Sequence, residues 1–221
     1  MILDETLLFE AVDTLAAREP RFAVVLDRHG VPPLRKSPEG FAELLRLVTE
    51  QAISLKAAEK IWRRLSDALA LTPLAVMALG ERRLFALGLS GAKARCFCAL
   101  ATAVTEGRLT VEALSTLPDT DARAALTAIP GIGPWTADNY LLSALGRADV
   151  WPAGDIALQE AARDLFALET RPGPKALTIL AEPWRPWRAA AARLLWSHYR
   201  HLKRLPQDPL GSPFTEPPHA L

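Results

Sequence analysis

Apolar residues recur at intervals of three and four positions along most of the chain, the spacing that is typical of amphipathic helices. Capping residues and prolines mark helix ends: Ser37 precedes Pro38 at one predicted start, and Pro20 ends the first helix. Runs of β-branched residues are short and scattered, so no sheet is expected and the fold class is all-α. The helices with both ends marked are predicted at 4–18, 81–87, 92–105, 156–168, 175–181 and 187–203.

Residues 126–146 join two predicted helices through the tight turn PGIG at 130–133. Glycine adopts backbone angles that other residues resist, and it leaves the turn without side chains. The amide groups that open the next helix would then point outward, where the helix dipole favours a phosphate. One interpretation is an ordinary connection between helices. The other is a site for the DNA backbone at Gly131, Gly133 and the small, polar Thr136, which would not read base sequence.

Composition argues against metal or cofactor chemistry, but it does not decide whether the chain binds nucleic acid. Lysine and arginine number 26 against 25 acidic residues, so the formal net charge of +1 neither favours nor excludes nucleic acid. Cys96 and Cys98 are too few for an iron–sulfur or zinc quartet, and the four histidines lack metal-site spacing, so neither a catalytic metal nor a cofactor is expected. No apolar run has membrane-spanning length and the N-terminus does not resemble a signal peptide, which favours a cytoplasmic protein without a membrane partner.

The hairpin segment is one of four motifs that follow one another along the chain. The others are EQAISLKAA at 50–58, DVWPAGD at 149–155 and EPWRPWR at 182–188. Together they resemble the helix-hairpin-helix (HhH-GPD) DNA glycosylase superfamily, most closely its AlkA-like branch, the DNA-3-methyladenine glycosylases II. The resemblance covers about residues 38–204 and implies two helical lobes with a DNA-binding cleft between them.

Three parts of the chain are expected on this basis. Residues 1–36 and 147–205 would form one helical lobe, to which both ends of the chain contribute. Residues 37–146 would form the central lobe, which ends in the helix-hairpin-helix. The tail 206–221 is rich in proline and is expected to be disordered.

The resemblance implies an enzyme of base excision repair that flips alkylated purines, 3-methyladenine or 7-methylguanine, out of duplex DNA and hydrolyses their N-glycosidic bond. Bifunctional members carry a lysine two residues after the second hairpin glycine, where this chain has Trp135. The amine that would form a Schiff base is therefore missing, and a monofunctional glycosylase without AP-lyase activity is expected. Its expected partner is double-stranded DNA containing alkylated bases, bound by a monomer in a bacterial-type nucleoid.

The resemblance makes Asp155, the last residue of DVWPAGD, the catalytic residue. A fixed carboxylate stabilises the positive charge that develops on the sugar, and an alkylated purine already carries the charge that lets it leave without protonation. The alternative role of Asp155 is an N-cap of the helix that begins at Ile156, and both roles can hold together. Of the other candidates, Asp138 is interpreted as a solvated charge and Asp149 as a structural loop residue.

Tryptophans are expected to hold the flipped base, because aromatic faces stack on a cationic ring and attract it. Trp135 and Trp196 match pocket tryptophans of the AlkA-like branch, and Trp151 lies in a neighbouring motif. For each of them core packing is the alternative. Asn139 and Ile156 stand where the branch often has tyrosines, which implies a less aromatic pocket.

Other DNA contacts follow from the same resemblance. Gln51 and Ser54 resemble residues near the minor groove, although Gln51 would also suit a helix surface. The large side chain that fills the hole left by the flipped base has no clear counterpart, since Gly91 stands at its place; Leu89 is the candidate, with core packing as the alternative. The family's hairpin can hold a monovalent cation on backbone carbonyls, here those of Thr127, Ile129 and Ile132.

Two other functions remain open from the sequence. The first is a glycosylase for other damaged or mismatched bases, which the missing lysine and cysteine quartet make less favourable. The second is a non-catalytic helix-hairpin-helix protein that binds DNA, which the presence of Asp155 and the tryptophans disfavours.

Overall fold

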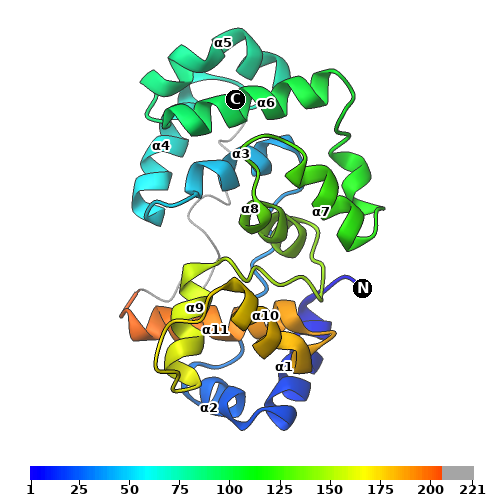
Figure 1. Cartoon of the computed structure of the whole chain (residues 1–221), viewed down its shortest axis with the longest axis vertical. Coiled ribbons are helices and arrows are strands. Elements are labelled where there is room, and N and C mark those ends of the chain that lie inside the picture. The colour runs from blue at the N-terminus through cyan, green and yellow to red at the C-terminus, as the bar shows by residue number, and fades with distance from the viewer. Residues whose placement is uncertain (206–221) are drawn as a thin grey trace. The chain divides into compact units, whose positions relative to one another are not determined.

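Helices account for the regular structure of the computed structural model, which describes residues 1–205 (Figure 1). Within these residues there is no β-strand, only an isolated bridge between Ile2 and Arg147. The prediction of an all-α fold is therefore confirmed. The prediction of disorder for the tail 206–221 lies outside the described residues.

The described chain divides into two compact units, of which the first, unit 1, contains Met1–Lys36 and the residues from Leu145 on. α11 packs against α9, α2 and α1. Four consecutive alanines at 189–192 are fully buried, and such small side chains let neighbouring backbones approach closely. The helices of unit 1 are α1 (Glu5–Arg18), α2 (Pro20–His29), α9 (Ile156–Leu165), α10 (Pro174–Ala181), the short 3₁₀ helix η3 (Glu182–Trp184) and α11 (Arg188–Leu202).

Within the described residues, the second unit, unit 2, is the single segment Ser37–Ala144. α5 and α6 pack on each other, and α3 packs on α4, α6 and α8. The helices of unit 2 are α3 (Phe41–Glu50), α4 (Leu55–Ala68), α5 (Pro73–Ala86), α6 (Gly91–Thr105), the 3₁₀ helix η1 (Glu112–Ser115), α7 (Asp119–Thr127), α8 (Pro134–Asn139) and the π-helical turn η2 (Tyr140–Ala144).

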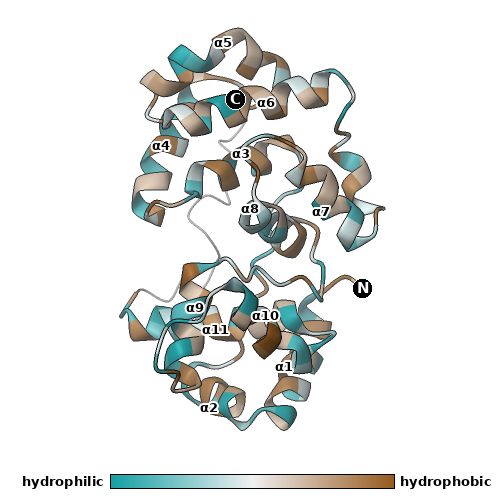
Figure 2. Ribbon diagram, viewed as in Figure 1, coloured by the Kyte–Doolittle hydropathy of each residue, from teal (hydrophilic) through white to brown (hydrophobic). Residues whose placement is uncertain are grey.

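Most helices in both units are amphipathic, as the hydrophobic spacing predicts (Figure 2). Their apolar stripes face the interior, where α1 buries Leu8, Val12 and Leu15 and α3 buries Leu44, Leu45 and Val48. None of the helices in residues 1–205 combines the length and the apolar character that crossing a bilayer requires.

Two helix starts near prolines differ from the sequence-based expectation. Pro20, expected only to end the first helix, also begins α2, because the fixed backbone angle of proline suits the first helical position. The helix expected at Pro38 begins at Phe41 instead, with Gly40 as its N-cap at φ 116°. The Gly40 amide donates to the Tyr140 hydroxyl at 2.9 Å, and the Ser37 amide donates to a carbonyl of η2. These long-range contacts keep the segment extended in place of a helical turn.

Candidate active site and DNA-binding hairpin

Asp155 occupies the N-cap position of α9. Its Oδ1 accepts a hydrogen bond from the Leu158 amide at 3.0 Å, the geometry of a helix cap. The indole Nε1 of Trp196, on α11, donates to the same oxygen at 3.1 Å. Two donors from different helices therefore fix the orientation of the carboxylate. Asp155 therefore caps α9, and its carboxylate also contacts Trp196, one of the predicted pocket tryptophans.

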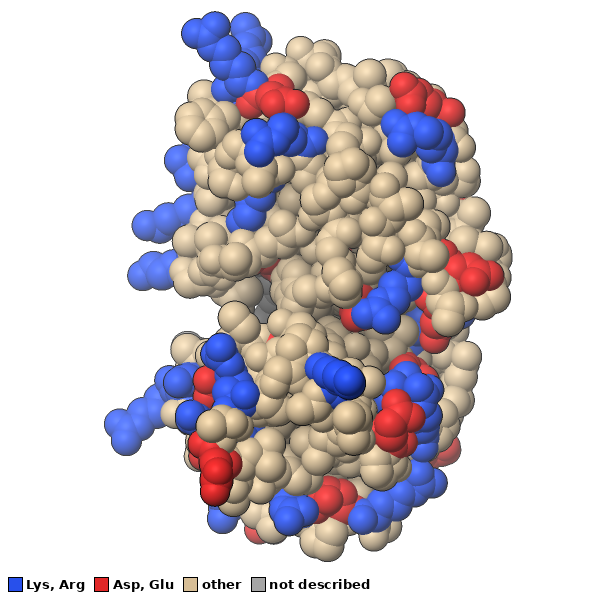
Figure 3. All heavy atoms as spheres, viewed as in Figure 1, with Lys and Arg blue, Asp and Glu red and all other residues tan. Residues whose placement is uncertain are grey.

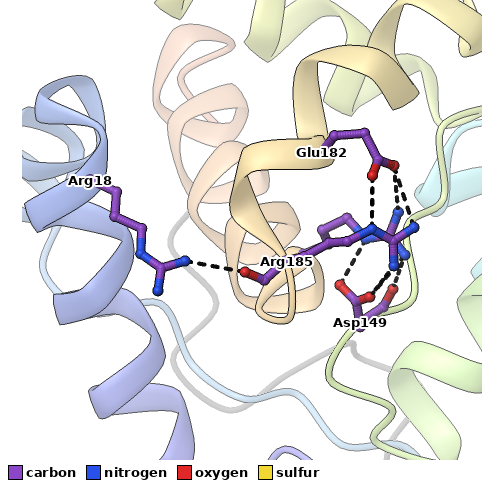
Figure 4. A network of polar contacts seen from close by, with 5 residues as sticks. Arg18, Asp149, Glu182 and Arg185 are labelled. Atoms are coloured by element: carbon purple, nitrogen blue, oxygen red, sulfur yellow. Dashed lines mark hydrogen bonds and ion pairs between the residues drawn. The ribbon is translucent and has the colours of Figure 1, made fainter.

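The loop that leads to Asp155 is held by a network of charged side chains in unit 1 (Figure 4). Asp149 accepts from Arg188 Nε at 2.8 Å and from Arg185 Nη1 at 2.5 Å, and Arg188 Nη2 also donates to the Asp149 carbonyl at 2.6 Å. Arg185 Nε donates to Glu182 at 2.9 Å, and this hydrogen bond lowers the pKa of the Glu182 carboxyl. Asp149 thus joins the loop to Arg188 at the start of α11. This position agrees with its interpretation from the sequence as a structural loop residue.

Asp138, interpreted from the sequence as a solvated charge, is almost fully buried, so that interpretation is wrong. Its Oδ2 accepts from Arg123 Nη2 on α7 at 2.9 Å. A buried carboxylate that pairs with an arginine contributes to the packing of the two hairpin helices, α7 and α8.

The predicted pocket residues of unit 1 fall into two groups. Ile156 is exposed next to Asp155, and Trp196 is half-buried at the carboxylate. Trp151 is buried instead, with its ring edge-to-face on Trp184 at 5.5 Å between centroids, and Trp184 packs in turn on Phe22. The assignment of Trp151 to the pocket is therefore corrected: its indole belongs to the aromatic core.

Two further predicted pocket residues belong to unit 2. Asn139 is buried, and its Nδ2 donates to the Trp135 carbonyl one helical turn earlier at 2.8 Å. Trp135, at the start of α8, is half-buried. The asparagine therefore satisfies part of its hydrogen-bonding capacity within its own helix. That these two residues act on the same base as Asp155 stays a prediction.

The hairpin between α7 and α8 requires glycine at position 131. Gly131 has φ 92°, a left-handed conformation that disfavours other residues. A Cβ built there would lie 2.6 Å from the Cβ of Cys96 on α6, which is buried. Gly133 differs, since its backbone is extended and a Cβ there would meet nothing within 4 Å. The absence of a side chain at Gly131 thus lets the turn pack against Cys96 on α6, and Gly133 leaves open space beside the turn.

The carbonyls predicted to hold a monovalent cation belong to this same turn. The Ile129 carbonyl accepts a hydrogen bond from the Ile132 amide at 3.0 Å, which closes the turn, and both isoleucine side chains are buried beneath it. Binding of a cation by Ile129, Ile132 and Thr127 stays a prediction.

Gln51, at the end of α3, is hydrogen-bonded to the hairpin. Its Nε2 donates to Thr136 Oγ1 at 2.8 Å and to the Gly131 carbonyl at 3.1 Å. Thr136 is only 1% exposed, so its side chain lies beneath the surface and its predicted contact with DNA is corrected to an internal hydrogen bond. The sequence contained both motifs, but no local signal shows that the glutamine of one bonds to the hairpin of the other.

Two more residues with predicted DNA contacts have clear structural positions. Ser54 is exposed and caps α4, where its Oγ accepts from the Ala57 amide at 3.3 Å. Leu89 is 2% exposed and belongs to the core of unit 2. A side chain held in the core is not available for insertion into DNA, so the interpretation of Leu89 as the inserted residue is corrected to the alternative of core packing.

Buried charges that the sequence did not reveal support the end of α3. Arg46 pairs with Glu43 at 2.6 Å and also with Glu50. Lys93 is buried on α6, and its Nζ donates at 2.8 Å to the carbonyl of Thr49 in the last turn of α3. Burial lowers the pKa of the Lys93 ammonium and raises the pKa of Glu50 to about 7. Lys93 therefore caps the C-terminal end of α3.

The pKa of Glu50 predicts a pH-dependent stability. Its pKa rises from 4.5 to about 7 on folding because burial outweighs the opposing attraction of Arg46. The folded state therefore binds the proton more tightly than the unfolded state. This contribution to the unfolding free energy is fully present below pH 4.5 and is lost as the pH rises through about 7. Urea denaturation across this window should show the loss, and Glu50→Gln should flatten it. An unchanged pH profile in the variant would assign the dependence to other groups.

Comparison with known proteins identifies a family that matches most of the chain. Residues 45–186 match the family model "HhH-GPD superfamily base excision DNA repair protein". A "DNA-3-methyladenine glycosylase 1" from Schizosaccharomyces pombe is 31% identical over 163 residues, which cover 72% of each chain. A "Putative DNA-3-methyladenine glycosylase YfjP" from Bacillus subtilis is 36% identical over 93 residues, 42% of this chain and 32% of that protein, so the match spans about a third of this relative's length.

A solved structure gives a similar result. The 3-methyladenine DNA glycosylase from Schizosaccharomyces pombe in complex with abasic DNA superimposes with a TM-score of 0.79 at 27% identity, covering 88% of this chain and 97% of that chain. The family match covers the hairpin, Asp155 and the loop that positions it. The chain therefore belongs to the HhH-GPD superfamily of base excision DNA repair proteins.

Proposed function

We propose that the protein is a monofunctional DNA glycosylase that hydrolyses the N-glycosidic bond of 3-methyladenine and 7-methylguanine in duplex DNA. The observation that carries the proposal is the carboxylate of Asp155, which the Leu158 amide and the Trp196 indole orient at the start of α9. The relatives named as 3-methyladenine glycosylases support the same substrate class.

The chemistry requires one well-placed anion. When the bond between C1′ and the base nitrogen breaks, its electron pair neutralises the cationic alkylated ring, which leaves as a neutral base. Positive charge develops on the sugar, and the carboxylate of Asp155 stabilises it electrostatically. Water adds to C1′ and releases a proton, and the same carboxylate is proposed to accept that proton. The product is an abasic site.

The flipped base would be held by aromatic and apolar surfaces. Trp196 lies at the carboxylate, and Ile156 is exposed beside it. An indole face attracts a cationic purine more strongly than a neutral one, which favours alkylated bases over normal ones. Trp135 stands where bifunctional enzymes have their lysine, so no Schiff base forms there and hydrolysis is the complete reaction.

The hairpin would bind the DNA backbone. Gly133 adds no side chain to the turn, the amides that follow Pro134 in the first turn of α8 would donate hydrogen bonds to a phosphate, and Gln51 holds the turn in place through the Gly131 carbonyl. Such contacts orient a duplex without reading its sequence. Hairpin and carboxylate belong to the same chain, so a monomer suffices.

The test is single-turnover release of methylated bases from alkylated duplex DNA. Release of 3-methyladenine and 7-methylguanine is expected, with strand cleavage only after alkali and no adduct trapped by borohydride. A trapped adduct would contradict the monofunctional assignment. Tight duplex binding without release of these bases would contradict the alkylpurine assignment and favour other lesions or a binding protein.

A further inference from the structure

One helix of unit 1 is bonded to both ends of the loop that leads to Asp155. Arg188, the first residue of α11, donates to the two carboxylate oxygens of Asp149 at 2.8 and 3.1 Å and to the Asp149 carbonyl at 2.6 Å. Trp196, further along α11, donates to Asp155 Oδ1 at 3.1 Å. The loop 149–155 therefore begins and ends on the same helix.

The helix sets the spacing of these two contacts. Arg188 and Trp196 are eight residues apart, which separates them by about 12 Å along the axis of α11. The four alanines at 189–192 are fully buried, and α11 packs against α9, α2 and α1, so the helix has little room to adjust. A change at one contact must therefore be taken up by the loop.

The loop is short and bonded within itself. The Ala153 amide donates to the Trp151 carbonyl and the Asp155 amide donates to the Pro152 carbonyl, both at 2.9 Å. Two successive turns of this kind leave the backbone few alternative conformations. The loop thus moves as one piece, and a shift of its first residue changes the orientation of its last.

Arg188 differs from the other arginine that pairs with Asp149. The side chain of Arg188 is 11% exposed, whereas that of Arg185 is 50% exposed (Figure 4). Cationic and anionic side chains lie next to one another over the surface of unit 1 (Figure 3), and exposed pairs contribute little because water and salt screen them. A guanidinium that bonds to both carboxylate oxygens also fixes the direction of its partner. Arg188 is therefore the arginine that holds the loop.

We infer that Arg188 is a positioning residue for the proposed reaction: it fixes the start of the loop on α11 and thereby keeps the Asp155 carboxylate in the orientation that Trp196 bonds. The inference rests on the proposed function, since it assumes that this carboxylate stabilises the developing charge. A fixed anion does so only at the right distance and orientation, and a displacement of about 1 Å can lower a rate by about 10²-fold.

The first test is single-turnover release of 7-methylguanine from alkylated duplex DNA with the protein in excess. Arg188→Gln should lower the rate constant at saturating protein by about 10–100-fold. The protein concentration that gives half the maximal rate should change by no more than about twofold. A merely structural role would have the opposite result, because partial unfolding raises this concentration and leaves the rate constant unchanged. Arg188→Lys should recover part of the rate, since an ammonium pairs with Asp149 but cannot form the bidentate contact.

The same substitution is then made together with Asp155→Asn. A residue that acts through the carboxylate has nothing left to position there, so Arg188→Gln should lower the residual rate by no more than about twofold. The control is Arg163→Gln in the otherwise wild-type protein. Arg163 pairs with Glu160 on α9 at 3.2 Å and is 48% exposed, and its loss should leave the rate constant unchanged.

The indole N–H of Trp196 gives a readout that needs no catalysis. Its signal in heteronuclear NMR can be assigned with Trp196→Phe. Arg188→Gln should shift this signal and speed its exchange with solvent, because the bond to Asp155 loosens, whereas the indole signal of Trp62 in unit 2 should stay in place. If circular dichroism shows that Arg188→Gln does not fold, Arg188→Lys takes its place in each comparison.

Four results would overturn the inference: an unchanged rate constant in the Arg188 variant, an undiminished effect of that variant in Asp155→Asn, an equal loss in Arg163→Gln, or an unchanged Trp196 signal. Absence of base release by the wild-type protein would instead contradict the proposed function. The Trp196 signal would then still decide whether Arg188 holds the carboxylate in place.

Discussion

Asp155→Asn is expected to lower the single-turnover rate of base release by about 10²–10³-fold or more, because it removes the charge that stabilises the developing cation. Asparagine has the same shape, and its side-chain carbonyl can still accept from the Leu158 amide and from Trp196 Nε1. It is also as good an N-cap as aspartate. Thermal stability and duplex affinity should therefore stay near the wild-type values, which isolates the effect of the charge.

Asp155→Ala separates the two roles of the residue. Like the asparagine variant it should lose base release, but it also loses the cap of α9, at a cost of about 0.5–2 kcal/mol in unfolding free energy. Urea denaturation and single-turnover kinetics measure the two losses independently. Base release by Asp155→Asn at the wild-type rate would remove the carboxylate from the reaction and leave only the capping role.

Gly131→Ala should produce the largest loss of stability among substitutions in the hairpin. The left-handed backbone at φ 92° costs a residue with a Cβ, and that Cβ would lie 2.6 Å from the Cβ of the buried Cys96. Backbone strain and overpacking together predict a loss of about 2–5 kcal/mol in unfolding free energy. Displacement of the turn should also weaken duplex binding by about tenfold or more.

Gly133→Ala is the matched control in the same turn. Its backbone is extended at φ −90°, and the added methyl group meets nothing within 4 Å, so stability should stay within about 0.5 kcal/mol of the wild-type value. If the open surface at Gly133 contacts the DNA backbone, the methyl group should still weaken duplex binding. Equal stability of the two variants would contradict the packing argument for Gly131.

Local sequence signals sufficed for much of the fold. Hydrophobic spacing gave the all-α class, and the N-cap Asp155 lies at the start of α9, where the sequence predicts it. A cap binds amides two or three residues away, so its partners are neighbours in sequence. The turn at Gly131 was recognisable for a similar reason, since its backbone angles exclude most other residues.

Contacts between distant residues decided the rest. α3 begins at Phe41 and not at Pro38 because the Gly40 amide is hydrogen-bonded to Tyr140. Thr136 is buried, and its hydroxyl accepts a hydrogen bond from Gln51 at the end of α3. Whether Trp151 lines a pocket or the core depended on which side chains pack over it, and in the structure its ring packs on Trp184 in the core of unit 1. Hydrophobic side chains of one kind serve equally well in a core, in a pocket or on an exposed turn. The sequence alone determined the helices, the hairpin and the candidate carboxylate, whereas only tertiary packing decided which side chains remain available for DNA.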